Sequence, residues 1–148
     1  MAPRKIDPEK LRAALDAQLI ALDSPAYDGP ASALADALIA AVVAAYDRGL
    51  EPERAAVRLA VRHLLERLAG AAPGRTVEVR VPPHAAVQAI EGPRHTRGTP
   101  PNVVETDART WIWLALGRIT WDEAVASGAV SASGARADLS DHLPVSGI

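Results

Sequence analysis

Three basic or titratable side chains stand close together in one irregular stretch of the chain. Arg94, His95 and Arg97 lie between Glu91 and Asn102, where glycine and proline are frequent and no helical or strand periodicity is seen. Guanidinium groups form paired hydrogen bonds with phosphate and carboxylate groups. The stretch therefore predicts a loop that binds an anionic group. The alternative is a rigid surface loop whose arginines pair with neighbouring carboxylates.

Other patterns that support catalysis or metal binding are weak. Glu91 and His95 are four residues apart, but Gly92 and Pro93 argue against the helix that would align them as metal ligands. The two Ser-Gly pairs lack the G-x-S-x-G pattern of a nucleophile, and no glycine-rich phosphate loop is present. We therefore expect no catalytic residue, no metal and no cofactor. An enzyme with His95 as general base is a third interpretation, without a second catalytic group.

The composition predicts one ordinary globular domain. The chain has 148 residues, a net charge of -2 and 49% hydrophobic residues. Without an overall positive charge, nucleic acid is not expected as a partner. The absence of cysteine is typical of a protein from the reducing cytoplasm. The longest apolar run, from Ala37 to Tyr46, is half as long as a membrane-spanning helix, so we do not expect the chain to span a membrane.

Alanine dominates the apolar residues. The sequence has 31 alanines and no phenylalanine, so much of its hydrophobic fraction carries a single methyl group. Because apolar burial contributes about 25 cal/mol per Å², alanine adds little free energy of folding. We expect a thin and closely packed core.

The first part of the chain predicts three helices. Asp7 and Pro8 are typical of a helix start, and leucines then recur at helical spacing as far as Leu22. A second apolar pattern covers 34–46, and a third covers 57–68. The leucines expected to face a core in the first helix are Leu11, Leu15, Leu19 and Leu22.

The periodicity changes after Arg75. Valines alternate with charged residues over 76–81, which predicts a strand with Val77, Val79 and Val81 facing the core. Further strands are expected at 85–90, 103–106 and 130–133. Short helices are expected after Asp107 and after Thr120, which opens a capping box, and one or two helical turns are expected over 137–143. Helices at both ends of the chain around antiparallel strands indicate an α+β fold.

Two of the three tryptophans lie on the helix expected after Asp107. Trp111 and Trp113 would project about 200° apart, so only one of them can face the core. Trp111 is in register with Leu114 and Ala115 and is the one expected to face inward.

The C-terminal third resembles a known family. The run Thr106-Asp107-x-x-Thr110-Trp111-x-x-Leu114-Ala115-x-Gly117-Arg118-Ile119-x-Trp121, followed by Ala124 to Gly128 and Val130 to Gly134, is similar to the closing helix–helix–strand element of the sterol carrier protein (SCP) sterol-binding domain. The Val-Arg-Val-Pro-Pro stretch at 79–83 and the loop at 91–102 resemble the bacterial, actinobacterial orthologue group of that family. The resemblance covers roughly residues 55–144.

The resemblance implies a five-stranded, largely antiparallel sheet with helices on one face. It also implies an apolar tunnel for a sterol, a fatty acyl chain or a phospholipid, and binding without catalysis. On this basis we expect an N-terminal helical segment over 1–50 and an SCP-like lipid-binding domain over 51–148. The apolar wall of the cavity is expected to include Ile90, Val104, Trp111, Leu114, Leu139 and Leu143.

Two functions from different classes follow. In the first, the chain carries a lipid or other apolar small molecule, and Arg94, His95 and Arg97 meet its polar head. In the second, alanine packing has closed the tunnel, and the same fold binds a protein partner. A continuous apolar cavity of at least about 300 Å³ would favour the first.

Overall fold

The computed structural model describes residues 5–92 and 102–145. The chain divides within helix α3 (Arg54–Ala71) into two compact units, the first ending at His63 and the second beginning at Leu64. The sequence predicts that the lipid-binding domain begins at residue 51, after an N-terminal segment that ends at residue 50. This boundary stays a prediction. None of the helices in the described ranges is long and apolar enough to span a bilayer.

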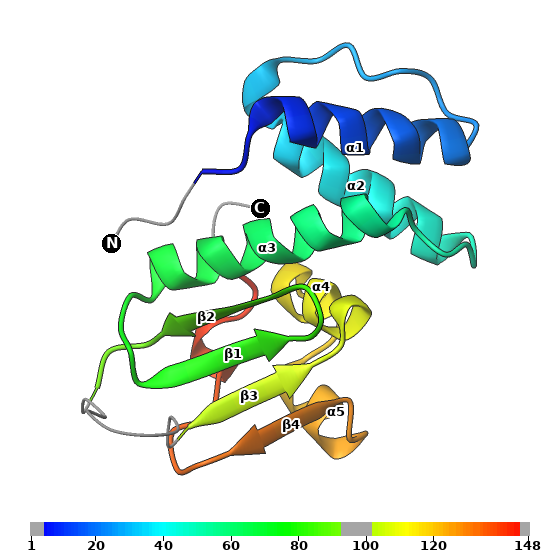
Figure 1. The fold of residues 1–148 in the computed structure, drawn as a ribbon. Helices are drawn as coiled ribbons and strands as arrows, with labels where there is room; N and C mark the ends of the chain where they lie inside the picture. The colour runs from blue at the N-terminus through cyan, green and yellow to red at the C-terminus, as the bar shows by residue number, and fades with distance from the viewer. Residues whose placement is uncertain (1–4, 93–101, 146–148) are drawn as a thin grey trace. The chain divides into compact units, whose positions relative to one another are not determined.

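The first unit contains helix α1 (Pro8–Ala21), the short 3-10 turn η1 (Ala31–Ala33), helix α2 (Leu34–Asp47) and the first part of α3 (Figure 1). The start of α1 agrees with the sequence prediction. The carboxylate of Asp7 accepts a hydrogen bond of 2.9 Å from the backbone N–H of Glu9, which satisfies one of the free donors at the helix N-terminus.

The core of the first unit departs in one place from the predicted leucine stripe. Leu19 is only half-buried, whereas Gln18 is 1% exposed. The side-chain oxygen of Gln18 accepts a hydrogen bond of 2.8 Å from the backbone N–H of Glu53, which compensates for the burial of the amide. Gln18 therefore fastens the start of α3 to α1. The other predicted core leucines of α1 and its C-cap are buried: Leu11, Leu15 and Leu22.

The second unit is built on a four-stranded sheet in the order β2-β1-β3-β4. Its strands are β1 (Val77–Val81), β2 (Ala85–Ala89), β3 (Val103–Thr106) and β4 (Val130–Ser133). β1 pairs antiparallel with β2 and parallel with β3, and β3 pairs antiparallel with β4. The described residues thus form an α+β fold with a mixed sheet of four strands, where the resemblance implied five.

Strand β2 ends at Ala89, one residue before the predicted end at Ile90. Ile90 has a φ of 70°. Its N–H donates to the carbonyl of Ala72 at 2.7 Å, and its carbonyl accepts from Thr76 at 3.2 Å. These contacts draw the chain away from β2 and towards the turn that precedes β1.

One face of β1 carries the core of the sheet. Val77, Val79 and Val81 are fully buried, as their alternation predicts. Glu78 and Arg80 are half-exposed, and the 2.6 Å hydrogen bond from Arg80 Nε to Glu78 Oε1 raises the pKa of the arginine.

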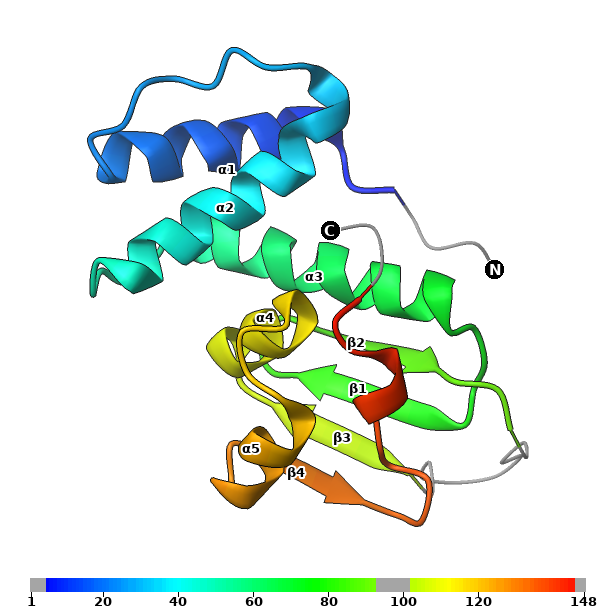
Figure 2. The same cartoon turned by 180° about the vertical axis from the view of Figure 1, so that it is seen from behind.

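Helices α4 (Ala108–Leu116) and α5 (Trp121–Ala126) and the 3-10 turn η2 (Ser140–His142) lie on the same side of the sheet (Figure 2). Over 137–143, where the sequence predicts one or two helical turns, the single 3-10 turn η2 forms. Trp111 is fully buried and Trp113 half-buried, which confirms the predicted orientation of α4.

The side chain of Asn102 links two distant segments of the second unit by hydrogen bonds. Its side-chain nitrogen donates to the carbonyl of Thr76 at 3.0 Å, and its side-chain oxygen accepts from the N–H of Arg136 at 2.9 Å. The asparagine is 6% exposed. It therefore links the start of β1 to the segment after β4, which leads into η2.

Candidate functional site

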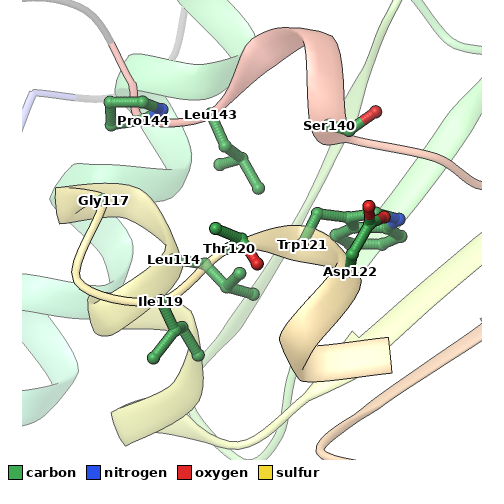
Figure 3. Close-up of a pocket in the computed structure, with 9 residues that line it drawn as sticks. All are labelled: Leu114, Gly117, Ile119, Thr120, Trp121, Asp122, Ser140, Leu143 and Pro144. Carbon is green, nitrogen blue, oxygen red and sulfur yellow. The ribbon is translucent and has the colours of Figure 1, made fainter. Parts of the chain in front are cut away.

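A pocket of about 260 Å³ lies between α4, α5 and the segment around η2 (Figure 3). Its apolar lining consists of Leu114, Ile119, Trp121, Leu143 and Pro144, together with the backbone of Gly117. Three polar side chains, Thr120, Asp122 and Ser140, also line it. Because these three are exposed, the pocket opens to solvent on their side.

The end of α4 shapes the first wall. Gly117 adopts a φ of 77° and its N–H donates to the carbonyl of Leu114 at 3.1 Å, so the helix stops and the chain reverses. A Cβ at Gly117 would lie 3.3 Å from Pro144, tighter than an ordinary contact. Glycine therefore allows the C-terminal segment to approach α4, while Ile119 follows on the pocket side.

The start of α5 supplies the second wall. The hydroxyl of Thr120 accepts a hydrogen bond of 3.1 Å from the backbone N–H of Glu123 and lies 3.0 Å from a carboxylate oxygen of the same residue. Thr120 thus caps α5, and the Glu123 carboxylate accepts from the Thr120 hydroxyl rather than from the Thr120 backbone N–H that a capping box uses. The cap places Trp121, which is 8% exposed, and Asp122 at the edge of the pocket.

The segment around η2 closes the third side. The N–H of Val145 donates to the carbonyl of Ala115 at 3.0 Å, which holds the segment against α4. Asp138 accepts a hydrogen bond of 2.8 Å from the N–H of Ser140 at the start of η2. This backbone hydrogen bond lowers the pKa of Asp138. Leu143 points from the segment towards Thr120 (Figure 3).

The chemistry of the lining suits an apolar group beside a few hydrogen-bonding partners. The carboxylate of Asp122 can accept a hydrogen bond, whereas the hydroxyl protons of Thr120 and Ser140 are already donated to Glu123 and Asp138. Among the described residues that line the pocket there is no lysine, arginine or histidine. In the described ranges, no group of three or more histidine, aspartate or glutamate side chains is placed to hold a metal ion.

The pocket brings together two of the residues that the sequence predicted for an apolar wall, Leu114 and Leu143. Val104, Trp111 and Leu139 are buried in the second unit, and Ile90 is half-buried after β2. Their role in holding a ligand stays a prediction.

The polar loop lies outside the described residues. Arg94, His95 and Arg97 fall in the range 93–101, so their predicted role in binding an anion is untested.

Several lining residues were not predicted as site residues from the sequence. Ile119, Asp122, Ser140 and Pro144 come from a helix end, a helix start and a 3-10 turn that are distant along the chain. The capping box at Thr120 was a local signal for the turn, but nothing local shows that the C-terminal segment folds back on it.

A comparison with protein families matches residues 53–145 to the family described as bacterial SCP ortholog. A comparison with curated proteins finds no match for this chain. The family match covers the end of the first unit and nearly all of the second, including every residue that lines the pocket described above. The chain therefore belongs to the bacterial SCP ortholog family, the bacterial branch of the sterol carrier proteins that its C-terminal third resembles.

Proposed function

We propose that this protein is a non-catalytic carrier that binds a lipid by placing an apolar group in the pocket between α4, α5 and η2. The observation that carries the proposal is the apolar lining of that pocket, above all Leu114, Ile119 and Leu143, within the segment that matches the family. The burial of a lipid chain against such side chains contributes about 25 cal/mol per Å².

The size of the pocket favours an acyl chain. Its volume of about 260 Å³ falls short of the continuous apolar cavity of about 300 Å³ that would favour a carrier over an interaction module, so the volume by itself does not favour the carrier, and it limits the ligand to a narrow group. A flexible acyl chain is narrow and enters by its end, whereas the fused rings of a sterol are wide and rigid. We therefore infer that a fatty acyl chain or one chain of a phospholipid enters the pocket and that the polar head lies outside it.

The residues at the rim of the pocket indicate where the charged head group of a lipid would lie. The carboxylate of Asp122 repels an anionic group held beside it. An anionic head would then be held elsewhere, and the loop with Arg94, His95 and Arg97 is the group of residues that we propose for it. Since the chain has no cysteine, we propose that the carrier works in the reducing cytoplasm.

Native mass spectrometry of gently purified protein tests the proposal first. We expect a bound mass in the lipid range that is lost in the variant Leu143→Asp, because the new carboxylate points into an apolar pocket. Val125→Asp is the matched control, since Val125 is 43% exposed and is not among the residues lining the pocket.

Titration of hexadecanoic acid, followed by tryptophan fluorescence, gives the affinity. We expect Leu143→Asp to weaken binding at least tenfold and Val125→Asp to leave it unchanged. Equal affinities in the two variants would show that the acyl chain binds elsewhere. If neither a bound lipid nor a titration is observed with the unmodified protein, the carrier proposal fails and the fold is better explained as a protein-interaction module.

A further inference from the structure

A second pocket, about 340 Å³ in volume, lies in the first unit. The proposed carrier function does not use it. The pocket lies between α1 and the start of α3, and its floor is formed by Ala14 and Leu59, both buried. Its rim carries the charged side chains of Lys10, Arg58 and Glu53. The remaining lining residues are the small side chains Ala13, Ala17 and Ala55.

The same helix presents an apolar side chain of unusual exposure. Ile20, near the C-terminal end of α1, is 79% exposed, which is the highest value among the large hydrophobic residues that the structure describes. At 100° per residue, Ile20 lies on the same side of α1 as Ala17 and Ala13, which are three and seven residues before it. A protruding apolar side chain and an apolar pocket thus share one exposed face of the unit.

The charges around the two features have opposite signs. Ile20 is flanked by Asp16 on α1 and by Asp23 just after the helix ends, and the Arg48 guanidinium donates to the carbonyl of Leu22 at the same end, so acidic residues outnumber basic ones there. The pocket is flanked by Lys10 and Arg58, with Glu53 as the single acidic residue of its lining. The backbone N–H of Glu53 is already held by Gln18, which fixes that corner of the pocket.

We propose that a second copy of this chain covers this face, so that Ile20 of each copy enters the pocket of the other. A twofold axis that lies in the face, midway between Ile20 and the pocket, exchanges the two features and therefore makes both contacts at once. It also brings the acidic surroundings of Ile20 to the basic rim of the pocket.

The volumes are compatible. The pocket of about 340 Å³ equals roughly ten water molecules at about 30 Å³ each, which leaves room for the four-carbon side chain of an isoleucine. The face is small, because α1 has 14 residues and is therefore about 21 Å long. The area that so short a face can bury is smaller than the area buried in a standard protein–protein interface. We therefore expect a weak dimer, with a dissociation constant of tens of micromolar.

Sedimentation equilibrium of the full chain between about 5 and 300 µM measures the association. We expect the unmodified chain to pass from monomer to dimer in this range. Ile20→Lys should weaken dimerisation at least a hundredfold, because two apolar contacts are lost and each lysine meets Lys10 and Arg58. Val125→Lys is the matched control, since it places the same charge on another exposed apolar residue, and it should leave the association unchanged.

A second variant separates this contact from non-specific stickiness. Ala17→Leu adds apolar surface but fills the pocket from its own chain, so it should weaken the dimer, whereas non-specific association would increase. Circular dichroism confirms that each variant is folded. A chain that is monomeric throughout the concentration range, or a dimer that survives both Ile20→Lys and Ala17→Leu, would overturn the proposal.

Discussion

Asp138 is a single residue that supports one wall of the pocket between α4, α5 and η2. Its carboxylate accepts the hydrogen bond from the N–H of Ser140 that starts η2, and Ser140 lines the pocket. Because that bond favours the charged form, the pKa of Asp138 is lower in the folded chain than in the unfolded chain. Its contribution to stability is therefore present above the ordinary aspartate pKa of about 3.9 and is lost as the pH falls through the lowered value.

This predicts a difference in acid sensitivity. Asp138→Asn keeps an acceptor oxygen but cannot titrate. Between about pH 5 and pH 3 the free energy of unfolding of the unmodified chain should fall more steeply than that of the variant. Urea unfolding followed by tryptophan fluorescence at several pH values measures both. Parallel curves would contradict a role for this carboxylate.

The predicted role of the loop arginines in binding an anionic head group can be tested by substitution. Arg94→Gln combined with Arg97→Gln should weaken the binding of hexadecanoate by about 1.5–3 kcal/mol for each lost charged hydrogen bond. Binding of hexadecan-1-ol, which has a chain of the same length and no charge, should not change. The control is Arg75→Gln with Arg136→Gln, which removes the same charge from two exposed arginines outside the loop. Isothermal titration of each lipid decides, and an unchanged affinity for hexadecanoate would show that the loop does not bind its head.

At the scale of elements, the junction between α3 and β1 depends on a glycine. Gly74 has a φ of 153°, and a Cβ there would lie 2.0 Å from the carbonyl oxygen of Ile90. That carbonyl accepts the hydrogen bond from Thr76 that begins the pairing of β1 with the chain after β2. A side chain at this position must displace backbone, so the start of the sheet cannot keep its geometry.

Two glycine-to-alanine variants should therefore act in opposite directions. Gly74→Ala should lower the free energy of unfolding by more than about 1 kcal/mol, because both the conformation and the space exclude a Cβ. Gly70→Ala should raise it by about 0.5–1 kcal/mol, because Gly70 lies in α3 with no atom within 4 Å of its added Cβ. Thermal unfolding compares the two, and a Gly74→Ala variant as stable as Gly70→Ala would refute the steric explanation.

At the scale of the whole molecule, α3 belongs to both compact units. Its 18 residues form one continuous helix that crosses the division between His63 and Leu64. The three tryptophans, Trp111, Trp113 and Trp121, all lie in the second unit. Tryptophan fluorescence therefore reports on that unit alone, while far-ultraviolet circular dichroism also reports on the helices of the first.

We expect the shared helix to couple the unfolding of the two units. Leu15→Ala should destabilise the first unit by about 2–5 kcal/mol, because Leu15 is 1% exposed. Both signals should then shift to lower urea concentration together. Ile20→Ala, measured below micromolar concentration, is the control and should change stability by no more than about 0.5 kcal/mol because Ile20 is exposed. A fluorescence midpoint that stays in place for Leu15→Ala would show that the units unfold independently.

The sequence by itself determined most of the local structure. Helix starts at Asp7, Asp107 and Thr120 were readable because a capping side chain bonds to N–H groups two or three residues away. The strand at 77–81 was readable because alternate valines share one face of an extended chain. The family resemblance could also be recognised from the sequence, because it depends on the order of such elements along the chain.

Only the tertiary structure determined how those elements pair and pack against one another. The parallel pairing of β1 with β3, the links that Gln18 and Asn102 make, and the contact of the C-terminal segment with α4 all join residues that are far apart along the chain. A pocket is formed by such contacts, so Ile119 and Ser140 line one without any local pattern that says so. The physical reason is range: caps and periodicity act over a few residues, whereas pairing, burial and cavity shape depend on how distant segments pack.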